Sequence, residues 1–168
     1  MAVYNFSFGS NMSSSRLLAR LPNATRIGTA TLAGYELTFD MLSCDGSGKG
    51  NIRPVDDDNA QVYGVVYQLN DAEKEILDAI EGPRYDCVDI QVTLLDGEKI
   101  AAHCYIANTT DANTLPYDWY MQHVYRGALE AGVPNAYSEA IKSRPMCQDS
   151  DTLRAAIEFA VHKNKNEN

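Results

Sequence analysis

Near its N-terminus the chain reads Tyr4-Asn5-Phe6-Ser7-Phe8-Gly9-Ser10-Asn11-Met12, and this run predicts a strand that stops at a glycine. Aromatic residues alternate with small polar residues as far as Phe8, so aromatic side chains share one face of the strand and polar ones the other. The alternation ends at Gly9, and a serine-rich segment then leads into the short helical pattern of residues 16–21.

The strand break admits two interpretations. Backbone N–H groups that lose their strand partners at the break, together with those at the start of the following helix, form a site for an anion. Alternatively, Gly9 serves only a tight turn, because glycine adopts backbone angles that other residues avoid. The pattern alone favours the turn, since short Gly-Ser motifs often match by chance.

Four further segments carry a signal in combination with Phe6–Met12. They are Gly46–Ile52, Val62–Tyr67, Leu77–Gly82 and the segment from Tyr120 through Gly127 to Pro134. In this order and spacing the five segments resemble the gamma-glutamylcyclotransferase family, and the match extends from about Val3 to about Lys142. One departure is Phe8, where the family usually has tyrosine.

The order of predicted elements indicates an α+β domain. The resemblance implies a small mixed, partly closed β-barrel with helices packed around it. We expect one domain over residues 1–168, in which about 3–142 match the family, 150–163 add a C-terminal helix and 164–168 form a polar tail.

The resemblance also implies a reaction. In a γ-glutamyl amide the substrate's own α-amine attacks its γ-carbonyl, so that 5-oxoproline forms and an amino acid or amine is released. This chemistry requires no protein nucleophile and no cofactor, only a curled substrate, a group that moves protons and donors for the developing oxyanion.

Glu81 matches the family's general acid/base in the context Leu77-Asp78-x-x-Glu81-Gly82. From the residues alone a surface glutamate at a helix end is favoured, although apolar neighbours such as Ile80 would raise its pKa. The resemblance implies that the substrate is bound by residues of the first strand and by two tyrosines, namely Asn5, Phe6, Ser7, Phe8, Gly9, Ser10, Tyr105 and Tyr120.

The tyrosines have structural alternatives. Tyr120 also fits a core stripe with Val124 and Ala128, and the two interpretations are equally supported. Tyr85 follows Glu81 closely, but its pattern favours an ordinary strand aromatic.

Two other classes of function stay open. One is an enzyme of the same fold that acts on another γ-glutamyl carrier, such as glutathione, an isopeptide or an antibiotic precursor. The other is a non-catalytic binding protein, an alternative that stays open because Phe8 departs from the family pattern.

Composition restricts the partners. The net charge of −9 and the pI near 4.7 argue against binding to nucleic acid or to an anionic membrane. We find no signal peptide and no apolar run of membrane-spanning length, so we expect a cytoplasmic protein that is a monomer or a homodimer. The four scattered cysteines are expected to be reduced and buried.

No metal or nucleotide site is predicted. The histidines at positions 103, 123 and 162 lack the spacing of metal ligands. Gly48-Lys49 lacks the Ser or Thr and the helix that a P-loop requires. Residues 43–51 are therefore expected to form a glycine-rich loop.

Local patterns predict the remaining elements. Thr25–Leu32 and Tyr35–Phe39 are expected to form a hairpin around Ala33-Gly34. Further strands are expected at 62–69, 85–94 and 99–107, and helices at 70–80, 116–131, 137–142 and 151–162. The apolar stripes of two helices are expected to be buried, namely Ile76, Leu77 and Ile80 in one and Leu153, Ile157 and Val161 in the other.

Overall fold

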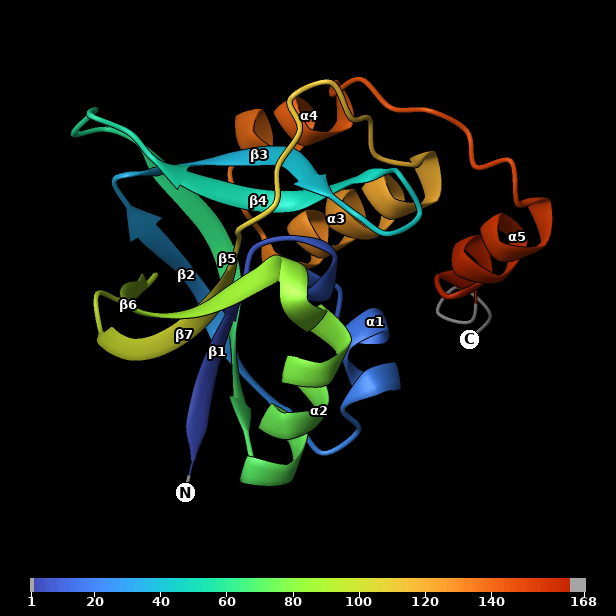
Figure 1. Ribbon diagram of the computed structural model, residues 1–168. Coiled ribbons are helices and arrows are strands. Elements are labelled where there is room, and N and C mark those ends of the chain that lie inside the picture. Colours follow the sequence, from blue (N-terminus) through green and yellow to red (C-terminus); the bar gives the residue numbers. More distant parts are fainter. Residues whose placement is uncertain (1, 164–168) are drawn as a thin grey trace.

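The fold is built on a closed barrel of five strands, in the order β1-β5-β2-β6-β7 (Figure 1). The computed structural model describes residues 2–163, so the predicted tail at 164–168 lies outside the described residues. The barrel strands are β1 (Val3–Ser7), β2 (Thr25–Ala33), β5 (Gln61–Leu69), β6 (Tyr85–Leu94) and β7 (Lys99–Ala107).

Pairing between the first and last strands closes the barrel. β1 runs antiparallel to β5 along its whole length, and it meets β7 in parallel where Asn5 pairs with His103. The barrel is therefore mixed, as predicted, but it is closed rather than partly closed. The parallel contact is invisible in local sequence patterns, because it joins residues almost one hundred positions apart.

A two-stranded sheet stands beside the barrel, formed by β3 (Tyr35–Leu42) and β4 (Gly48–Pro54). The predicted hairpin between the segments around Gly34 is wrong, because β2 pairs with β5 and β6 whereas β3 pairs with β4. Gly34 does make a turn with a φ of 78°, but the chain leaves the barrel there.

The expected glycine-rich loop is also partly wrong, since β4 begins at Gly48. A Cβ atom on Gly48 would lie only 2.3 Å from the carbonyl oxygen of Phe39. Glycine is present here so that two backbones can approach closely, which is a property of strand packing and not of a flexible loop.

Helices cover the barrel and the small sheet, and α5 lies apart from the strands beside α1 and α3 (Figure 1). The helices are α1 (Ser14–Arg20), α2 (Asp71–Glu81), α3 (Asp118–Ala131), α4 (Asn135–Lys142) and α5 (Thr152–Ala160), with short 3-10 turns at Ser10–Met12 and Gly82–Arg84. Within residues 2–163, no helix has the length and apolar character to cross a membrane.

Helix α2 starts and ends as its sequence predicts. Asn70 and Glu73 form a reciprocal capping box, and Gly82, with a φ of 70°, ends the helix directly after Glu81. The expected buried stripe is wrong in part, because Leu77 is buried whereas Ile76 and Ile80 are 46% and 42% exposed. The helix therefore packs against the protein through few apolar side chains, chiefly Leu77, and Ile80 near its C-terminus stays at the surface.

Helix α5 contradicts its predicted stripe more strongly. Leu153 and Ile157 are 71% and 62% exposed. The side chains that hold α5 to the rest of the protein are Arg154 and Glu158, which bind Asp149 and other buried polar groups. Charge pairing, and not the apolar stripe, orients this helix.

The cysteines also depart from expectation. All four are free thiols, but Cys44 and Cys87 are exposed and only Cys104 is buried. The strand pattern correctly brings Cys87 and Cys104 near each other, since Val88 is the register partner of Cys104. The expectation of free thiols is therefore confirmed, whereas the expectation that all four are buried is wrong.

Candidate active site

A small cavity of about 60 Å³, here called the inner cavity, opens where β1 ends. It brings together all nine residues that the sequence predicts for catalysis and substrate binding. The lining residues are Asn5, Phe6, Ser7, Phe8, Gly9, Ser10, Asn11, Gly50, Glu81, Tyr85, Tyr105 and Tyr120.

Glu81 is the only carboxylate among the described residues that line the inner cavity. It is the last residue of α2, and the side-chain amide of Asn11 donates a hydrogen bond to its Oε1 atom over 3.3 Å. Burial raises the pKa of Glu81, while the positive charges of Arg20 and Arg16 oppose that rise. A carboxylate in such surroundings accepts and returns a proton more readily than an exposed one.

Asn5 presents an unused acceptor at the inner cavity. Its side chain is only 2% exposed, and its Nδ2 atom donates to the Ser7 hydroxyl over 2.8 Å. Its Oδ1 atom has no hydrogen-bond partner within the described part of the chain. A buried acceptor without a partner is costly, so an N–H group of a ligand would be stabilised beside it.

Two glycines let a tyrosine hydroxyl enter the site. The Tyr120 hydroxyl accepts the Gly50 N–H over 2.8 Å, and the Tyr85 hydroxyl donates to the Gly50 carbonyl over 2.7 Å. A Cβ atom on Gly50 or on Gly9 would lie 3.0 Å or 3.3 Å from the Tyr120 hydroxyl. Glycine at both positions is therefore explained by close approach, which the turn interpretation of Gly9 did not foresee.

The remaining aromatic residues form the walls of the inner cavity. The Tyr105 hydroxyl donates to Oδ1 of Asp78 over 2.7 Å, which fixes its ring. The rings of Phe6 and Phe8 are buried with centroids 6.3 Å apart. Phe8 brings no hydroxyl to the cavity where the family usually has tyrosine.

Sequence reasoning missed three of the lining residues. Asn11 and Gly50 lie inside two of the family-like segments but were given no role, and Tyr85 was interpreted as an ordinary strand aromatic. The signal for Asn11 was its place beside Gly9 and Ser10. The signal for Tyr85 was its position directly after the helix that ends at Glu81.

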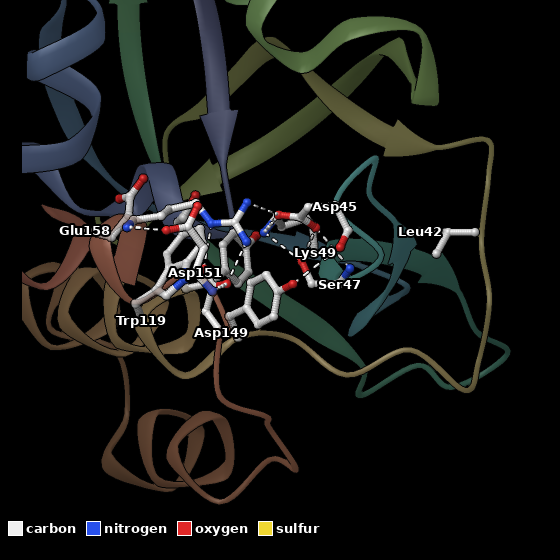
Figure 2. A network of polar contacts seen from close by, with 12 residues as sticks. Leu42, Asp45, Ser47, Lys49, Trp119, Asp149, Asp151 and Glu158 are labelled. Atoms are coloured by element: carbon white, nitrogen blue, oxygen red, sulfur yellow. Dashed lines mark hydrogen bonds and ion pairs between the residues drawn. The ribbon is translucent and has the colours of Figure 1, made fainter. Parts of the chain in front are cut away.

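A polar network supports the wall next to this cavity, and Figure 2 shows Asp45, Ser47 and Lys49 facing Trp119 and Asp149. Ser47 donates to Asp45 over 2.6 Å, and the Trp119 indole donates to Asp149 over 2.8 Å. The Lys49 ammonium lies 4.7 Å from the centre of the Trp119 ring. The loop before β4 is therefore ordered by charges.

Two histidines that are far apart in the sequence contact each other in the structure, which their spacing did not predict. His123 and His162 approach within 2.6 Å through their ring nitrogens, and the other nitrogen of His123 lies 2.8 Å from Glu158. Across residues 2–163, however, no three His, Cys, Asp or Glu side chains converge in a way that could hold a metal ion.

Comparison with known proteins finds relatives that are similar in sequence. Residues 61–141 match the AIG2-like family. The gamma-glutamylcyclotransferases of Mus musculus and Homo sapiens are each 28% identical to the chain over 144 residues, which cover 82% of this chain and 76% of each relative.

Solved structures share the fold. The structure of a gamma-glutamyl cyclotransferase superposes with a TM-score of 0.86 at 24% identity, covering 97% of this chain and 99% of that one. An uncharacterized protein from Homo sapiens gives a TM-score of 0.80 at 24% identity, covering 94% of this chain and 98% of that one.

The barrel, the added sheet and the surrounding helices define a protein with the gamma-glutamylcyclotransferase-like fold. In sequence the chain is similar to gamma-glutamylcyclotransferases, as the order of its five segments predicted.

Proposed function

We propose that the protein is a γ-glutamylcyclotransferase that converts a γ-glutamyl amide into 5-oxoproline and a free amine. The observation that carries this proposal is the convergence of all nine predicted residues on the inner cavity, with Glu81 as the only carboxylate among its described lining residues. A single carboxylate at that position suits a reaction that needs proton transfer but no protein nucleophile.

The proposed steps balance within the substrate. The α-amine nitrogen forms a bond to the γ-carbonyl carbon, and Glu81 takes the proton that this nitrogen loses. The bond from that carbon to the amide nitrogen then breaks, and Glu81 gives the proton to the departing amine. Water is not consumed, and no electrons are exchanged with another molecule.

The other cavity residues support the geometry that this reaction requires. The free Oδ1 atom of Asn5 can accept an N–H of the substrate's α-amine. Backbone N–H groups of Ser10 and Asn11, at the first turn of a 3-10 helix, have no partner within that turn and can donate to the carboxylate or to the developing oxyanion. The aromatic walls favour a curled glutamyl chain over an extended one.

The proposal is tested by incubating the protein with γ-glutamyl amino acids and amines and measuring 5-oxoproline. We expect release with the wild type, and a kcat at least about 10²-fold lower with Glu81→Gln, which keeps the shape and loses the base. Arg126 is exposed and does not line the inner cavity, so Arg126→Gln is the control and should retain activity. Absence of 5-oxoproline with every compound, or full activity of Glu81→Gln, would refute the proposal.

A further inference from the structure

A second and larger cavity, here called the outer cavity, adjoins the inner one. It has a volume of about 340 Å³, within the size range of small-molecule sites. The two cavities share Ser10, Glu81, Tyr85 and Tyr120 in their linings. Glu81 therefore stands at the boundary between them.

The outer cavity is strongly basic. Its lining includes Arg16, Arg20, Lys49 and Arg84, and Glu81 is the only carboxylate among the described residues that line it. The chain as a whole has 23 acidic and 14 basic residues, so an even spread of charge would give the opposite sign. Such a concentration of cations inside a cavity attracts an anionic ligand.

Two of these cations are already paired. Arg16 binds Glu158 over 2.8 Å, and Lys49 lies 3.6 Å from Asp45. Their carboxylate partners offset most of their charge, so these two side chains contribute shape and hydrogen bonds more than net charge.

The other two cations have only neutral partners. Arg20 donates to the side-chain oxygen of Asn11 over 3.3 Å, and Arg84 donates to the backbone carbonyl of Leu42. Considering residues 2–163, no carboxylate lies within ion-pair distance of either guanidinium. Each guanidinium has five N–H donors, so most of them remain available to a ligand in the cavity.

The environment of Arg20 favours the binding of a further anion beside it. Burial and the like charge of Arg16 lower the pKa of Arg20. The negative charges of Glu81 and Glu158 oppose this fall. Binding of a carboxylate between Arg20 and Arg84 would relieve this repulsion and would satisfy their free donors.

Position then determines which part of the substrate the outer cavity holds. In the proposed reaction the glutamyl group occupies the inner cavity, and Glu81 gives its proton to the departing amine at the boundary. The departing amine and its substituents consequently extend into the outer cavity.

We propose that the preferred leaving group is an acidic amino acid, so that the substrates are γ-glutamyl compounds such as γ-glutamyl-glutamate, and that Arg20 and Arg84 recognise the side-chain carboxylate. This inference rests on the proposed function and adds the chemical class of the leaving amine. A leaving amino acid with a neutral side chain offers only its α-carboxylate to the two guanidinium groups and is therefore disfavoured, and a cationic side chain is repelled.

The test compares three substrates that share the glutamyl part and differ in the side chain of the leaving amino acid. They are γ-glutamyl-glutamate, its isostere γ-glutamyl-glutamine, and γ-glutamyl-lysine linked through the lysine α-amine. We expect kcat/KM for 5-oxoproline release to be at least about tenfold higher for the glutamate compound than for the glutamine compound, and lowest for the lysine compound. The preference should weaken as salt is raised.

Arg84→Gln tests the recognition itself, because Arg84 is not among the charges that shift the pKa of Glu81. This variant should lose most of the preference for glutamate over glutamine, whereas the exposed control Arg126→Gln should keep it. Equal kcat/KM for the three substrates, or an Arg84→Gln enzyme with an unchanged preference, would overturn the inference while leaving the proposed function intact.

A binding measurement separates failure of this inference from failure of the proposed function. Calorimetry of Glu81→Gln with the glutamate and glutamine compounds measures the binding preference with little turnover. Both ligands place the same glutamyl group in the inner cavity, so a difference in affinity comes from the leaving group. Tighter binding of the glutamate compound, lost in the double variant Glu81→Gln/Arg84→Gln, supports the basic outer cavity even if the wild type releases no 5-oxoproline. Equal binding of the two compounds refutes it.

Discussion

At the scale of single residues, Glu81 depends on neighbours that come from other elements. Its carboxylate receives a hydrogen bond from Asn11, and Asn11 in turn accepts one from Arg20. Burial raises the pKa of Glu81, and the positive charges of Arg20 and Arg16 limit that rise. The proton affinity of the proposed base is therefore set jointly by desolvation and by two cations.

A pH profile follows from this arrangement. Glu81 must be ionised to accept a proton, so kcat/KM should rise with pH along an acid limb whose midpoint lies above the ordinary glutamate value of 4.5. Arg20→Gln removes a charge that lowers the pKa of Glu81, so the midpoint should move to higher pH.

The control for this profile is Arg126→Gln, whose limb should coincide with that of the wild type. Initial rates of 5-oxoproline release between pH 4 and pH 8 provide the measurement. A midpoint that moves to lower pH in Arg20→Gln would contradict the account of Glu81.

At the scale of elements, α5 is held by a buried charge network. Glu158 binds Arg16 over 2.8 Å and His123 over 2.8 Å, while Arg16 also donates to the Ser10 hydroxyl over 3.1 Å. The hydrogen bond with His123 and the charge of Arg16 lower the pKa of Glu158 to about 2. The network thus connects the C-terminal helix to the strand break at the proposed site.

The matched pair Glu158→Ala and Leu153→Ala tests this docking. Glu158→Ala leaves the buried Arg16 and His123 without their common partner and should destabilise the protein by roughly 2–3 kcal/mol. Leu153 is 71% exposed, so Leu153→Ala should change stability by no more than about 0.5 kcal/mol. Urea unfolding gives both values, and a larger loss for Leu153→Ala would show that the apolar stripe docks the helix after all.

At the scale of the whole molecule, barrel closure buries a histidine. His103 pairs with Asn5 where β1 meets β7, and its side chain is 4% exposed. Burial lowers the pKa of His103 to about 4, with a further contribution from the charge of Lys74. The Nε2 atom has no hydrogen-bond partner within residues 2–163, so a proton added there would be poorly accommodated.

This burial makes stability depend on pH. Below the ordinary histidine pKa of 6.5 the unfolded chain binds a proton at residue 103, whereas the folded protein does not until the pH approaches 4. Neutral His103 therefore makes its full contribution to the free energy of unfolding above pH 6.5. Roughly 3 kcal/mol of that free energy is lost as the pH falls from 6.5 toward about 4.

The measurement is urea unfolding from pH 7 to pH 4 for the wild type and for His103→Gln. The unfolding free energy of the wild type should fall relative to that of His103→Gln as the pH decreases through the window. A difference that stays constant would show that His103 does not titrate in this way.

The sequence alone determined several features that depend on neighbouring residues. The capping box of Asn70 and Glu73 placed the start of α2, and the turn around Gly97 placed β6 and β7 at the predicted bounds. The family resemblance also named nine of the twelve residues that line the inner cavity. These signals are local because capping, turns and strand alternation act over a few residues.

Tertiary structure decided what depends on residues far apart in the chain. Only the folded chain shows that β2 and β3 belong to different sheets, and that α5 turns Arg154 and Glu158 inward. Likewise, Arg20 and Arg84 come from different elements, and no local spacing links them to one cavity. Partner choice between distant groups depends on long-range packing and charge pairing, which local sequence patterns do not encode.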